Sequence, residues 1–311
     1  MLREDQRQPL RLRTLTLANI RCIDQKTLNF FDLSGAPHDQ VVLMGPSGSG
    51  KSSVLLALAH LCELLDGPGQ AEEPYGPRVI RLGTEMGSIA AEFQLGAVEI
   101  AAQLALRGSD SPWLRPVTAL RQTPSQPRLA WPPRGRMAYV PPQCTVDIAR
   151  RLAQFRWRSQ RLAKDESGQV PLHPALLRLR SLFAALDSTR RSPVFFLDSD
   201  EVYLCEGSWP ANIERSCAEF AASRATPPLP IRCASDGERA TFELAAQLTL
   251  REVPPEVLLL DEPLCSWEES RRARIIQAVR QCLPSAQIVV ATSSRAIQRS
   301  VHDYERLNLG G

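Results

Sequence analysis

Hydrophobic and polar residues follow strand and helix periods in the first third of the chain. Residues 11–18 alternate between the two kinds, as a strand with one buried face does. The apolar run 40–44 predicts a short buried strand, and leucines at helical spacing predict a helix over 51–65. Further strands are predicted at 26–30, 88–95 and 98–106, the last two as a hairpin that turns at Gly96. We therefore expect residues 1–106 to form the N-terminal part of an α/β core.

The middle of the chain, residues 107–230, has a different composition. Residues 107–136 include six prolines and six arginines, with Asp110 as the only acid, which predicts a long irregular loop. The later hydrophobic pattern predicts strands at 137–140, 194–197 and 202–204, helices at 147–163, 176–186 and 214–223, and a proline-rich joint at 226–230. This region is predicted to be a loop and helical insertion in the core.

Residues 231–311 return to alternating helices and buried strands. Helices are predicted at 238–251 and 268–283, and buried strands at 257–260 and 287–291. We expect this region to be the C-terminal part of the same core. No heptad series is sustained, so no long coiled coil is expected.

Composition and charge are those of an ordinary globular chain. Of the 311 residues 43% are hydrophobic and 23% charged, and the net charge is +3. No apolar run reaches the roughly 20 residues that span a bilayer, and the charged N-terminus lacks a secretory signal, so a cytoplasmic protein without membrane contact is expected. Lysine occurs only three times, which fits either a GC-rich genome or a preference of arginine for phosphate contacts.

Cysteine and histidine do not form a metal-binding pattern. The eight cysteines are scattered without a CxxC pair, and none of the four histidines lies near a cysteine at ligand spacing. The sequence therefore gives no support for a zinc site.

A glycine-rich loop follows the strand at 40–44 and opens the helix at 51–65. It reads Gly45-Pro46-Ser47-Gly48-Ser49-Gly50-Lys51-Ser52, followed by Ser53. Glycines allow the tight turn that aims successive backbone N–H groups at phosphates, at the N-terminus of a helix. Lys51 is placed to bind the β- and γ-phosphates, and the Ser52 hydroxyl to ligate Mg²⁺. The loop predicts binding of ATP with Mg²⁺.

An acidic pair ends the buried strand at 257–260. Asp261 is placed to hold Mg²⁺, and Glu262 is one residue further, where a general base polarises the attacking water. Acidic residues that end a strand are common, but the phosphate-binding loop about 200 residues upstream favours catalysis.

A third motif, Ser235-Asp236-Gly237-Glu238-Arg239, precedes a predicted helix and lies 24 residues before the acidic pair, counted from Glu238 to Glu262. By itself it is a helix-capping pattern. Along the chain the phosphate-binding loop comes first, the Ser235–Arg239 motif second and the acidic pair third. This order resembles that of an ABC-type ATPase head. The resemblance implies that Ser235 and Gly237, with Glu238 in the same loop, bind the γ-phosphate held by a second subunit.

The N-terminal segment narrows the resemblance. Residues 15–22, Leu-Thr-Leu-Ala-Asn-Ile-Arg-Cys, resemble the opening of the SMC, RecF and OLD-type ATPases, often grouped as AAA family ATPases. The resemblance covers 1–106 and 231–300 well and 107–230 poorly. It implies an α/β P-loop NTPase fold with a mixed sheet core like that of ABC ATPases, an N-terminal antiparallel β-lobe and an inserted helical subdomain.

Glutamine is expected at a loop that senses Mg²⁺ and the γ-phosphate in this family. Gln143 follows Ala138-Tyr139-Val140-Pro141-Pro142, which is similar to the strand that leads into the helical lobe of such ATPases. Gln94 lies at a more usual distance from the phosphate loop but inside a predicted strand. An ordinary proline-rich turn at Gln143 is the alternative.

Two positions depart from the family pattern. Ser293 stands where the family has a switch histidine, and a hydroxyl can bind the γ-phosphate but cannot carry an imidazolium charge. Hydrolysis is therefore expected to be slow or to await a partner. After the acidic pair, Leu264-Cys265-Ser266-Trp267-Glu268 replaces the transporter-like Ser-Ala-Leu-Asp, which disfavours a transporter subunit.

A basic segment lies in the predicted helix 147–163. Nucleic acid or an acidic partner is one reading of this segment, and a solvated face is the other. Its arginines are Arg150, Arg151, Arg156, Arg158 and Arg161.

These observations lead to an ATP-hydrolysing head that forms a homodimer or higher oligomer around two ATP molecules. No C-terminal nuclease domain is expected, so a separate effector such as a nuclease, in DNA repair or antiphage defence, is what the resemblance implies. The alternatives are a transporter ATPase subunit, a non-hydrolytic ATP-gated module and, less well supported, a P-loop kinase.

Overall fold

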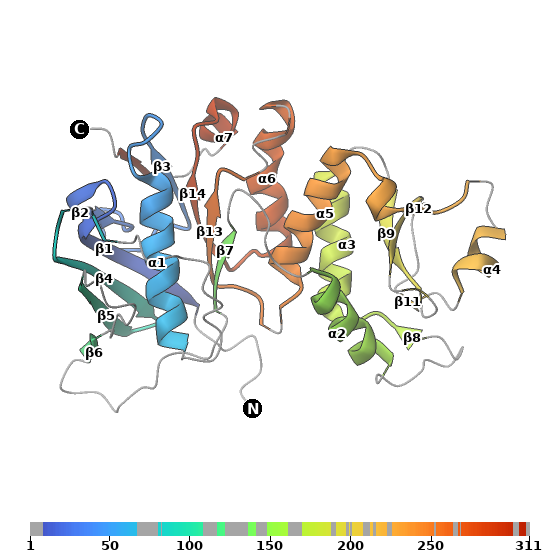
Figure 1. Cartoon of the computed structure of the whole chain (residues 1–311), viewed down its shortest axis with the longest axis horizontal. Helices are drawn as coiled ribbons and strands as arrows, with labels where there is room; N and C mark the ends of the chain where they lie inside the picture. Colours follow the sequence, from blue (N-terminus) through green and yellow to red (C-terminus); the bar gives the residue numbers. More distant parts are fainter. Residues whose placement is uncertain are drawn as a thin grey trace. The chain divides into compact units, whose positions relative to one another are not determined.

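The computed structural model describes most of the chain in two compact units (Figure 1). The described residues are 9–66, 80–81, 83–107, 117–121, 136–140, 148–160, 170–187, 191–196, 199, 201–207, 212–213, 216–222, 226–251, 253–263, 267, 269–300 and 305–308. The first unit comprises residues 1–142, 255–263 and 285–311, and the second comprises 143–254 and 264–284. This division differs from the three ranges expected from the sequence, because 231–254 and 264–284 group with the second unit.

An antiparallel sheet forms one layer of the first unit. Its strands, in spatial order, are β2 (Ile23–Asn29), β1 (Leu10–Ile20), β4 (Met86–Leu95), β5 (Val98–Arg107) and β6 (Val117–Arg121). In β1, Leu10 and Leu12 are buried, and then Leu15 and Leu17, so the alternation shifts by one residue. The pairing of β1 with β4 shifts at the same place, as a β-bulge requires.

Strand β6 corrects the prediction of an irregular loop throughout 107–136. Its residues pair with β5, from Ala101 opposite Arg121 to Ala105 opposite Val117. The proline and arginine content of the region dominated the prediction, but Val117, Thr118 and Leu120 favour a strand, and β5 offers them a free edge.

A parallel sheet forms the second layer. Its strands, in spatial order, are β15 (Glu305–Asn308), β3 (Gln40–Met44), β14 (Gln287–Ala291), β13 (Val257–Asp261) and β7 (Met137–Val140). Every residue of β13 and β14 is buried, as expected for strands covered on both faces. Strand β15, which lies beside β3, was not predicted because its residues form no apolar run.

Helix α1 (Lys51–Asp66) packs against both sheets of the first unit (Figure 1). Val54, Leu55, Leu58 and Leu61 are buried in a core shared with residues of β1, β4, β5, β13 and β14. The short helix α7 (Arg295–Ser300) follows β14. Because α1 begins at Lys51, this packing fixes the phosphate-binding loop at the carboxyl ends of the parallel strands.

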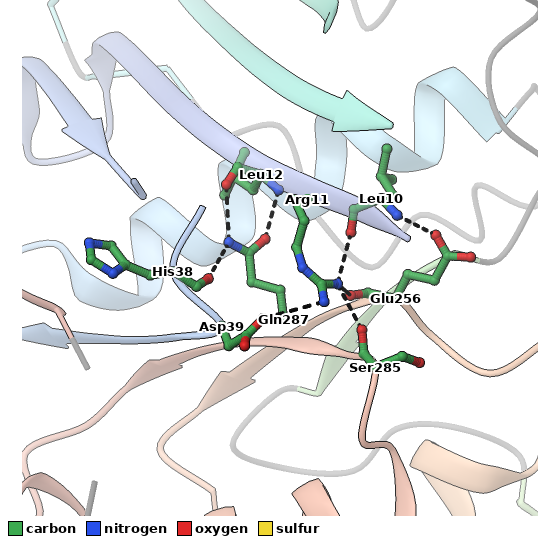
Figure 2. Close-up of polar contacts among 8 residues, drawn as sticks. All are labelled: Leu10, Arg11, Leu12, His38, Asp39, Glu256, Ser285 and Gln287. Carbon is green, nitrogen blue, oxygen red and sulfur yellow. Dashed lines mark hydrogen bonds and ion pairs between the residues drawn. The ribbon is translucent and has the colours of Figure 1, made fainter. Parts of the chain in front are cut away.

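The amino ends of the parallel strands are joined to β1 by polar side chains (Figure 2). The Arg11 guanidinium donates to the carbonyl oxygen of Ser285 at 2.7 Å and pairs with Asp39 at 3.3 Å. Glu256 accepts from the backbone N–H of Leu10 at 2.6 Å and from Arg136 at 3.0 Å. The two sheets are thus connected on the side opposite the phosphate-binding loop.

The second unit is mainly helical. Helix α3 (Pro174–Leu186) packs against α5 (Asp236–Thr249) and α6 (Glu269–Cys282), and α2 (Ile148–Gln160) contacts α5. One sheet of this unit contains β9 (Arg191–Phe195), β10 (Val202–Glu206) and β12 (Leu229–Pro230), and another contains β8 (Val170–Pro171) and β11 (Asn212–Ile213). The unit also contains α4 (Cys217–Ala222) and the 3-10 turn Ile231–Cys233.

The α/β fold class is confirmed. Among the described residues, no helix has the length and apolar character to cross a membrane.

Candidate functional site

The residues predicted to act on ATP in the first unit lie together at the carboxyl ends of the parallel strands. Strands β3, β14 and β13 are neighbours, with Leu43 opposite Ala291 and Ala291 opposite Asp261. The segments that leave their carboxyl ends carry the phosphate-binding loop, Thr292 and Glu262 respectively. Ligands of parallel α/β sheets bind at this edge.

The phosphate-binding loop needs glycine at two of its turns. Gly48 has φ +82° and Gly50 has φ +97°, a left-handed conformation that other residues rarely adopt. A Cβ at Gly50 would also lie 3.1 Å from the Sγ of Cys22 and 3.1 Å from Ile23. The backbone of the loop is therefore closely packed on the turn between β1 and β2.

Lys51 lies across this loop. Its side chain is buried, and its Nζ donates to the carbonyl oxygens of Gly45 at 2.9 Å and Pro46 at 3.0 Å. These bonds hold the ammonium group against the loop, and the backbone of Lys51 begins α1. A positive charge together with a helix N-terminus suits the binding of phosphate groups.

Ser52 and Asp261, both expected to bind Mg²⁺, lie in contact. The Ser52 hydroxyl donates to Oδ1 of Asp261 at 2.9 Å, and the Tyr139 hydroxyl donates to Oδ2 at 3.2 Å. Asp261 is 1% exposed. Burial raises the pKa of Asp261, while the hydrogen bonds from Ser52 and Tyr139 oppose this rise.

The side-chain oxygens of Ser52 and Asp261 are suitable ligands for Mg²⁺. A hydroxyl and a carboxylate are hard oxygen ligands, and Mg²⁺ in nucleotide sites takes one or two protein oxygens and completes its shell with water and phosphate. The described residues contain no cluster of three or more His, Cys, Asp or Glu side chains that suits a metal. Within this part of the chain, Mg²⁺ would therefore need water and phosphate as further ligands.

Glu262 has an unusual backbone and a firmly held side chain. Its φ is +42°, and its N–H donates to the carbonyl oxygen of Ala291 at 2.8 Å. Its Oε1 accepts from the backbone N–H of Ser293 at 2.8 Å, and its Oε2 from the Thr292 hydroxyl at 3.2 Å. Ser293 thus reaches Glu262 through its backbone, and the predicted contact of its hydroxyl with a γ-phosphate stays a prediction.

The loop expected at 235–238 forms the N-cap and first turn of α5 in the second unit. Ser235 is the N-cap of α5: its Oγ accepts from the N–H of Glu238 at 3.3 Å, and the Glu238 carboxylate accepts from the N–H of Ser235 at 3.0 Å. The carbonyl oxygen of Gly237 accepts from the Thr241 hydroxyl at 2.7 Å. The capping pattern seen in the sequence is therefore real, and it presents the N-terminus of a 14-residue helix.

Arg191 joins this loop to strand β9. Its guanidinium donates to Oε1 of Glu238 at 3.0 Å, and Glu238 is 5% exposed. Burial alone would raise the pKa of Glu238, but the hydrogen bonds from Ser235 and the charge of Arg191 bring this pKa below its ordinary value. Glu238 is therefore held as a carboxylate.

Several predicted site residues are placed elsewhere or lie outside the described residues. Ser53 is buried, with its hydroxyl 3.9 Å from the Sγ of Cys22. Gln94 lies in β4, and its side chain donates to the carbonyl oxygen of Gly96. Gln143 and the segment 264–266 lie outside the described residues, so their predicted roles stay predictions.

The basic face predicted for the helix around 147–163 needs one correction. Arg156 is 6% exposed and donates to the carbonyl oxygen of Phe196, so it does not face a partner. Arg158 lies over the ring of Phe155, and Arg151 is half-buried. Arg161 and the side chain of Arg150 lie outside the described residues. Sequence pattern could not show that Arg156 would turn inward to bind a carbonyl group.

Sequence reasoning missed three residues that touch the predicted site. Tyr139 contacts Asp261, Thr292 contacts Glu262, and Arg191 contacts Glu238. For Thr292 a signal was present, since it is a polar residue directly after the apolar run 288–291. Tyr139 and Arg191 depend on pairings between distant segments, which no local pattern gives.

Comparisons with known proteins find similar folds among solved structures. No protein-family model matches the chain, and no curated protein matches it. Among solved structures, the SMC head domain from Thermotoga maritima is 14% identical, with a TM-score of 0.53 over 96% of this chain and 97% of that one. An Smc head domain bound to the C-terminal domain of ScpA, from Pyrococcus furiosus, is 12% identical, with a TM-score of 0.57 over 94% and 92%. The recombination mediator RecF is 13% identical, with a TM-score of 0.53 over 98% of both chains. The chain has the fold of an SMC or RecF head.

Proposed function

We propose that this protein is an ATP-hydrolysing head of the SMC and RecF type that works as a nucleotide-gated dimerisation switch. The observation that carries the proposal is the contact of Ser52 with Asp261, beside Glu262, at the mouth of the phosphate-binding loop. A Mg²⁺ site, a general base and a phosphate cradle are then supplied by one sheet edge. The similarity of fold to SMC and RecF heads supports this reading.

Each residue has a defined task in this proposal. Lys51 binds the β- and γ-phosphates, and Ser52 with Asp261 holds Mg²⁺, which neutralises phosphate charge when it is bound. Glu262 accepts a hydrogen bond from the attacking water and takes its proton. These tasks need no residue from the second unit, so the first unit carries the chemical groups of one site.

The second unit supplies a contact between subunits. Ser235 and Gly237 lie at the N-terminus of α5, where backbone N–H groups and the helix dipole favour an anion. We infer that this loop binds the γ-phosphate held by another copy of the chain. ATP then closes the dimer, and hydrolysis reopens it.

The output of the switch goes to a separate partner. Solved SMC heads include complexes with ScpA, and RecF is described as acting in the RecFOR pathway. By analogy, a DNA-repair or antiphage-defence effector, such as a nuclease, is the partner class we propose. Among the described arginines of α2, Arg156 is excluded from the nucleic-acid hypothesis because it is 6% exposed and donates to the carbonyl oxygen of Phe196.

Replacing the general base tests the chemistry. Glu262→Gln should retain ATP binding, followed with a fluorescent ATP analogue, and lower phosphate release by about 10²–10⁴-fold. The exposed Glu243→Gln on α5 is the matched control and should leave phosphate release unchanged. ATP binding without hydrolysis by the wild-type protein would favour the non-hydrolytic module, and equal turnover of Glu262→Gln and wild type would remove Glu262 from the mechanism.

A second substitution tests the contact between subunits. Ser235→Arg places a bulky cation at the start of α5 and should abolish ATP-driven dimerisation while monomers still bind ATP. Light scattering with the Glu262→Gln background, which holds ATP, gives the oligomeric state. A dimer formed by the Ser235→Arg variant would contradict the role of this loop.

A further inference from the structure

Thr292 is a buried residue that points its hydroxyl at the general base. It follows the last residue of β14 and is 0% exposed. Its Oγ1 donates to Oε2 of Glu262 at 3.2 Å and accepts from the backbone N–H of Ser294 at 3.0 Å. A hydroxyl has a single hydrogen. Because the N–H of Ser294 occupies a lone pair of the Thr292 oxygen, the hydroxyl hydrogen is directed to Glu262.

The segment that carries Thr292 is itself anchored. The Ser294 hydroxyl accepts from the N–H of Ile297 at 3.3 Å, and the Ser294 carbonyl oxygen accepts from the N–H of Gln298 at 3.1 Å. Ser294 is 4% exposed and Ile297 is 0% exposed. A chain of hydrogen bonds therefore runs from the first turn of α7 through Ser294 and Thr292 to the carboxylate of Glu262.

Three bonds from consecutive residues fix Glu262. Besides the hydroxyl of Thr292, the N–H of Ser293 donates to Oε1, and the carbonyl oxygen of Ala291 accepts from the N–H of Glu262. Glu262 needs such support, because a non-glycine residue at φ +42° is held in a sparsely populated conformation. A carboxylate accepts about four hydrogen bonds, so two donors leave room for a water molecule.

We propose that Thr292 is a positioning residue for hydrolysis, which fixes the Glu262 carboxylate so that its remaining lone pairs face the attacking water. This inference rests on the proposed function, in which Glu262 is the general base. Position 293 then acts through its backbone N–H, and the side-chain contact to the general base comes from the residue before it. The geometry assigns the support of the base to a threonine hydroxyl that carries no charge.

The kinetic test removes and restores the hydroxyl. Thr292→Val keeps the shape of the side chain and should lower kcat about 10-fold, the effect of losing one hydrogen bond to a charged group, with KM for ATP changed less than about 2-fold. Thr292→Ser retains a hydroxyl and should restore most of kcat. Thr249→Val is the matched control, since Thr249 is equally buried but donates to the carbonyl oxygen of Ala245 in α5.

A second measurement reads the contact without nucleotide. Thr292→Val, Glu262→Ala and the double variant form a cycle whose melting temperatures are compared by calorimetry. Because both residues share one hydrogen bond, the loss in the double variant should be smaller than the sum of the single losses. If Thr292→Val does not fold, Thr292→Ala takes its place in both measurements.

The outcomes separate this inference from the proposed function. No phosphate release by the wild-type protein would overturn both. If the wild type hydrolyses ATP and Glu262→Gln does not, the function stands. In that case any one of three results would overturn the positioning role alone. The first is a wild-type kcat for Thr292→Val, and the second is a Thr292→Ser variant as slow as Thr292→Val. The third is a loss of melting temperature in the double variant that equals the sum of the single losses.

Discussion

The side-chain amide of Gln287 binds both backbone groups of Leu12, although these residues are 275 positions apart in the sequence. Its Oε1 accepts from the Leu12 N–H at 2.7 Å, and its Nε2 donates to the Leu12 carbonyl oxygen at 3.0 Å and to that of His38 at 2.8 Å (Figure 2). Strand β2 pairs with β1 only from Thr14 onward. The amide of Gln287 therefore replaces a neighbouring strand at the start of β1.

Removing this amide should destabilise the first unit. Gln287→Met keeps a similar volume but leaves the N–H and carbonyl groups of Leu12 buried without their partner. We expect the free energy of unfolding to fall by about 2–4 kcal/mol, measured by chemical denaturation. Gln247→Met is the control: Gln247 is also buried, but its Oε1 has no partner among the described residues, so little change is expected. Equal effects of the two substitutions would contradict the bridging role.

Tyr139 should affect the binding of Mg²⁺ with ATP. Tyr139→Phe removes the hydroxyl that donates to Asp261, so that Ser52 is the one described side chain that still donates to this carboxylate in the free protein. The Mg²⁺ concentration needed for half-maximal ATP binding should rise about 10-fold, as for other groups that orient metal ligands. Fluorescence titration of Mg²⁺ at fixed nucleotide measures this. Tyr203→Phe, in β10 of the second unit, should not change it.

Arg191 should stabilise the loop at the start of α5. Arg191→Met leaves the Glu238 carboxylate buried without its cation, and we expect a loss of about 1–2 kcal/mol in unfolding free energy because the pair is partly exposed. Adding Glu238→Gln removes the buried charge and retains a side chain that can complete the cap. The double variant should therefore be more stable than Arg191→Met alone by thermal denaturation. A double variant that is less stable would show that the pair does not explain the loss.

His173 should make the second unit sensitive to mild acid. It caps α3 by accepting the N–H of Ala175 on Nδ1, which requires a neutral ring. Burial, with the charges of Arg158 and Arg178, lowers the pKa of His173 below its ordinary value of 6.5. The unfolded state then binds the proton more strongly, so this stabilisation is present above pH 6.5 and is lost as the pH falls through the lowered pKa.

The measurement compares unfolding at neutral pH and at about pH 5.5. His173→Asn keeps a capping side chain that does not titrate, and it should lose less stability on acidification than the wild type. Burial also lowers the pKa of His60 in α1, so a part of the pH dependence should survive the substitution. An unchanged pH dependence would contradict the role of His173.

Features that a few adjacent residues define were predicted correctly from the sequence. The phosphate-binding loop, the apolar strand that ends at Asp261 and the Ser235–Glu238 cap are each defined by a few adjacent residues. By contrast, β6 was hidden because prolines and arginines surround it, and β15 because its four residues have no apolar pattern. Both are edge strands, whose formation depends on an available neighbour rather than on their own residues.

Contacts within the site show the same limit. That Thr292 touches Glu262 depends on β14 lying beside β13 in register, and that Arg156 turns inward depends on a carbonyl group 40 positions away. Residue type predicts that a group is able to form such bonds, but the partner is selected by tertiary packing. For this reason, the chemical groups of the site were identified from the sequence while the residues that orient them were not.

The position of β3 between β14 and β15 has a consequence for synthesis of the chain. Strand β3, which leads into the phosphate-binding loop, is translated well before both of its neighbours. At about 5–20 residues per second, the 248 positions from Gln40 to its partner Ile288 in β14 take roughly 12–50 s to translate. During that interval β3 is without its sheet partners. A nascent chain that stops before β14 should consequently depend on chaperones and should not retain ATP.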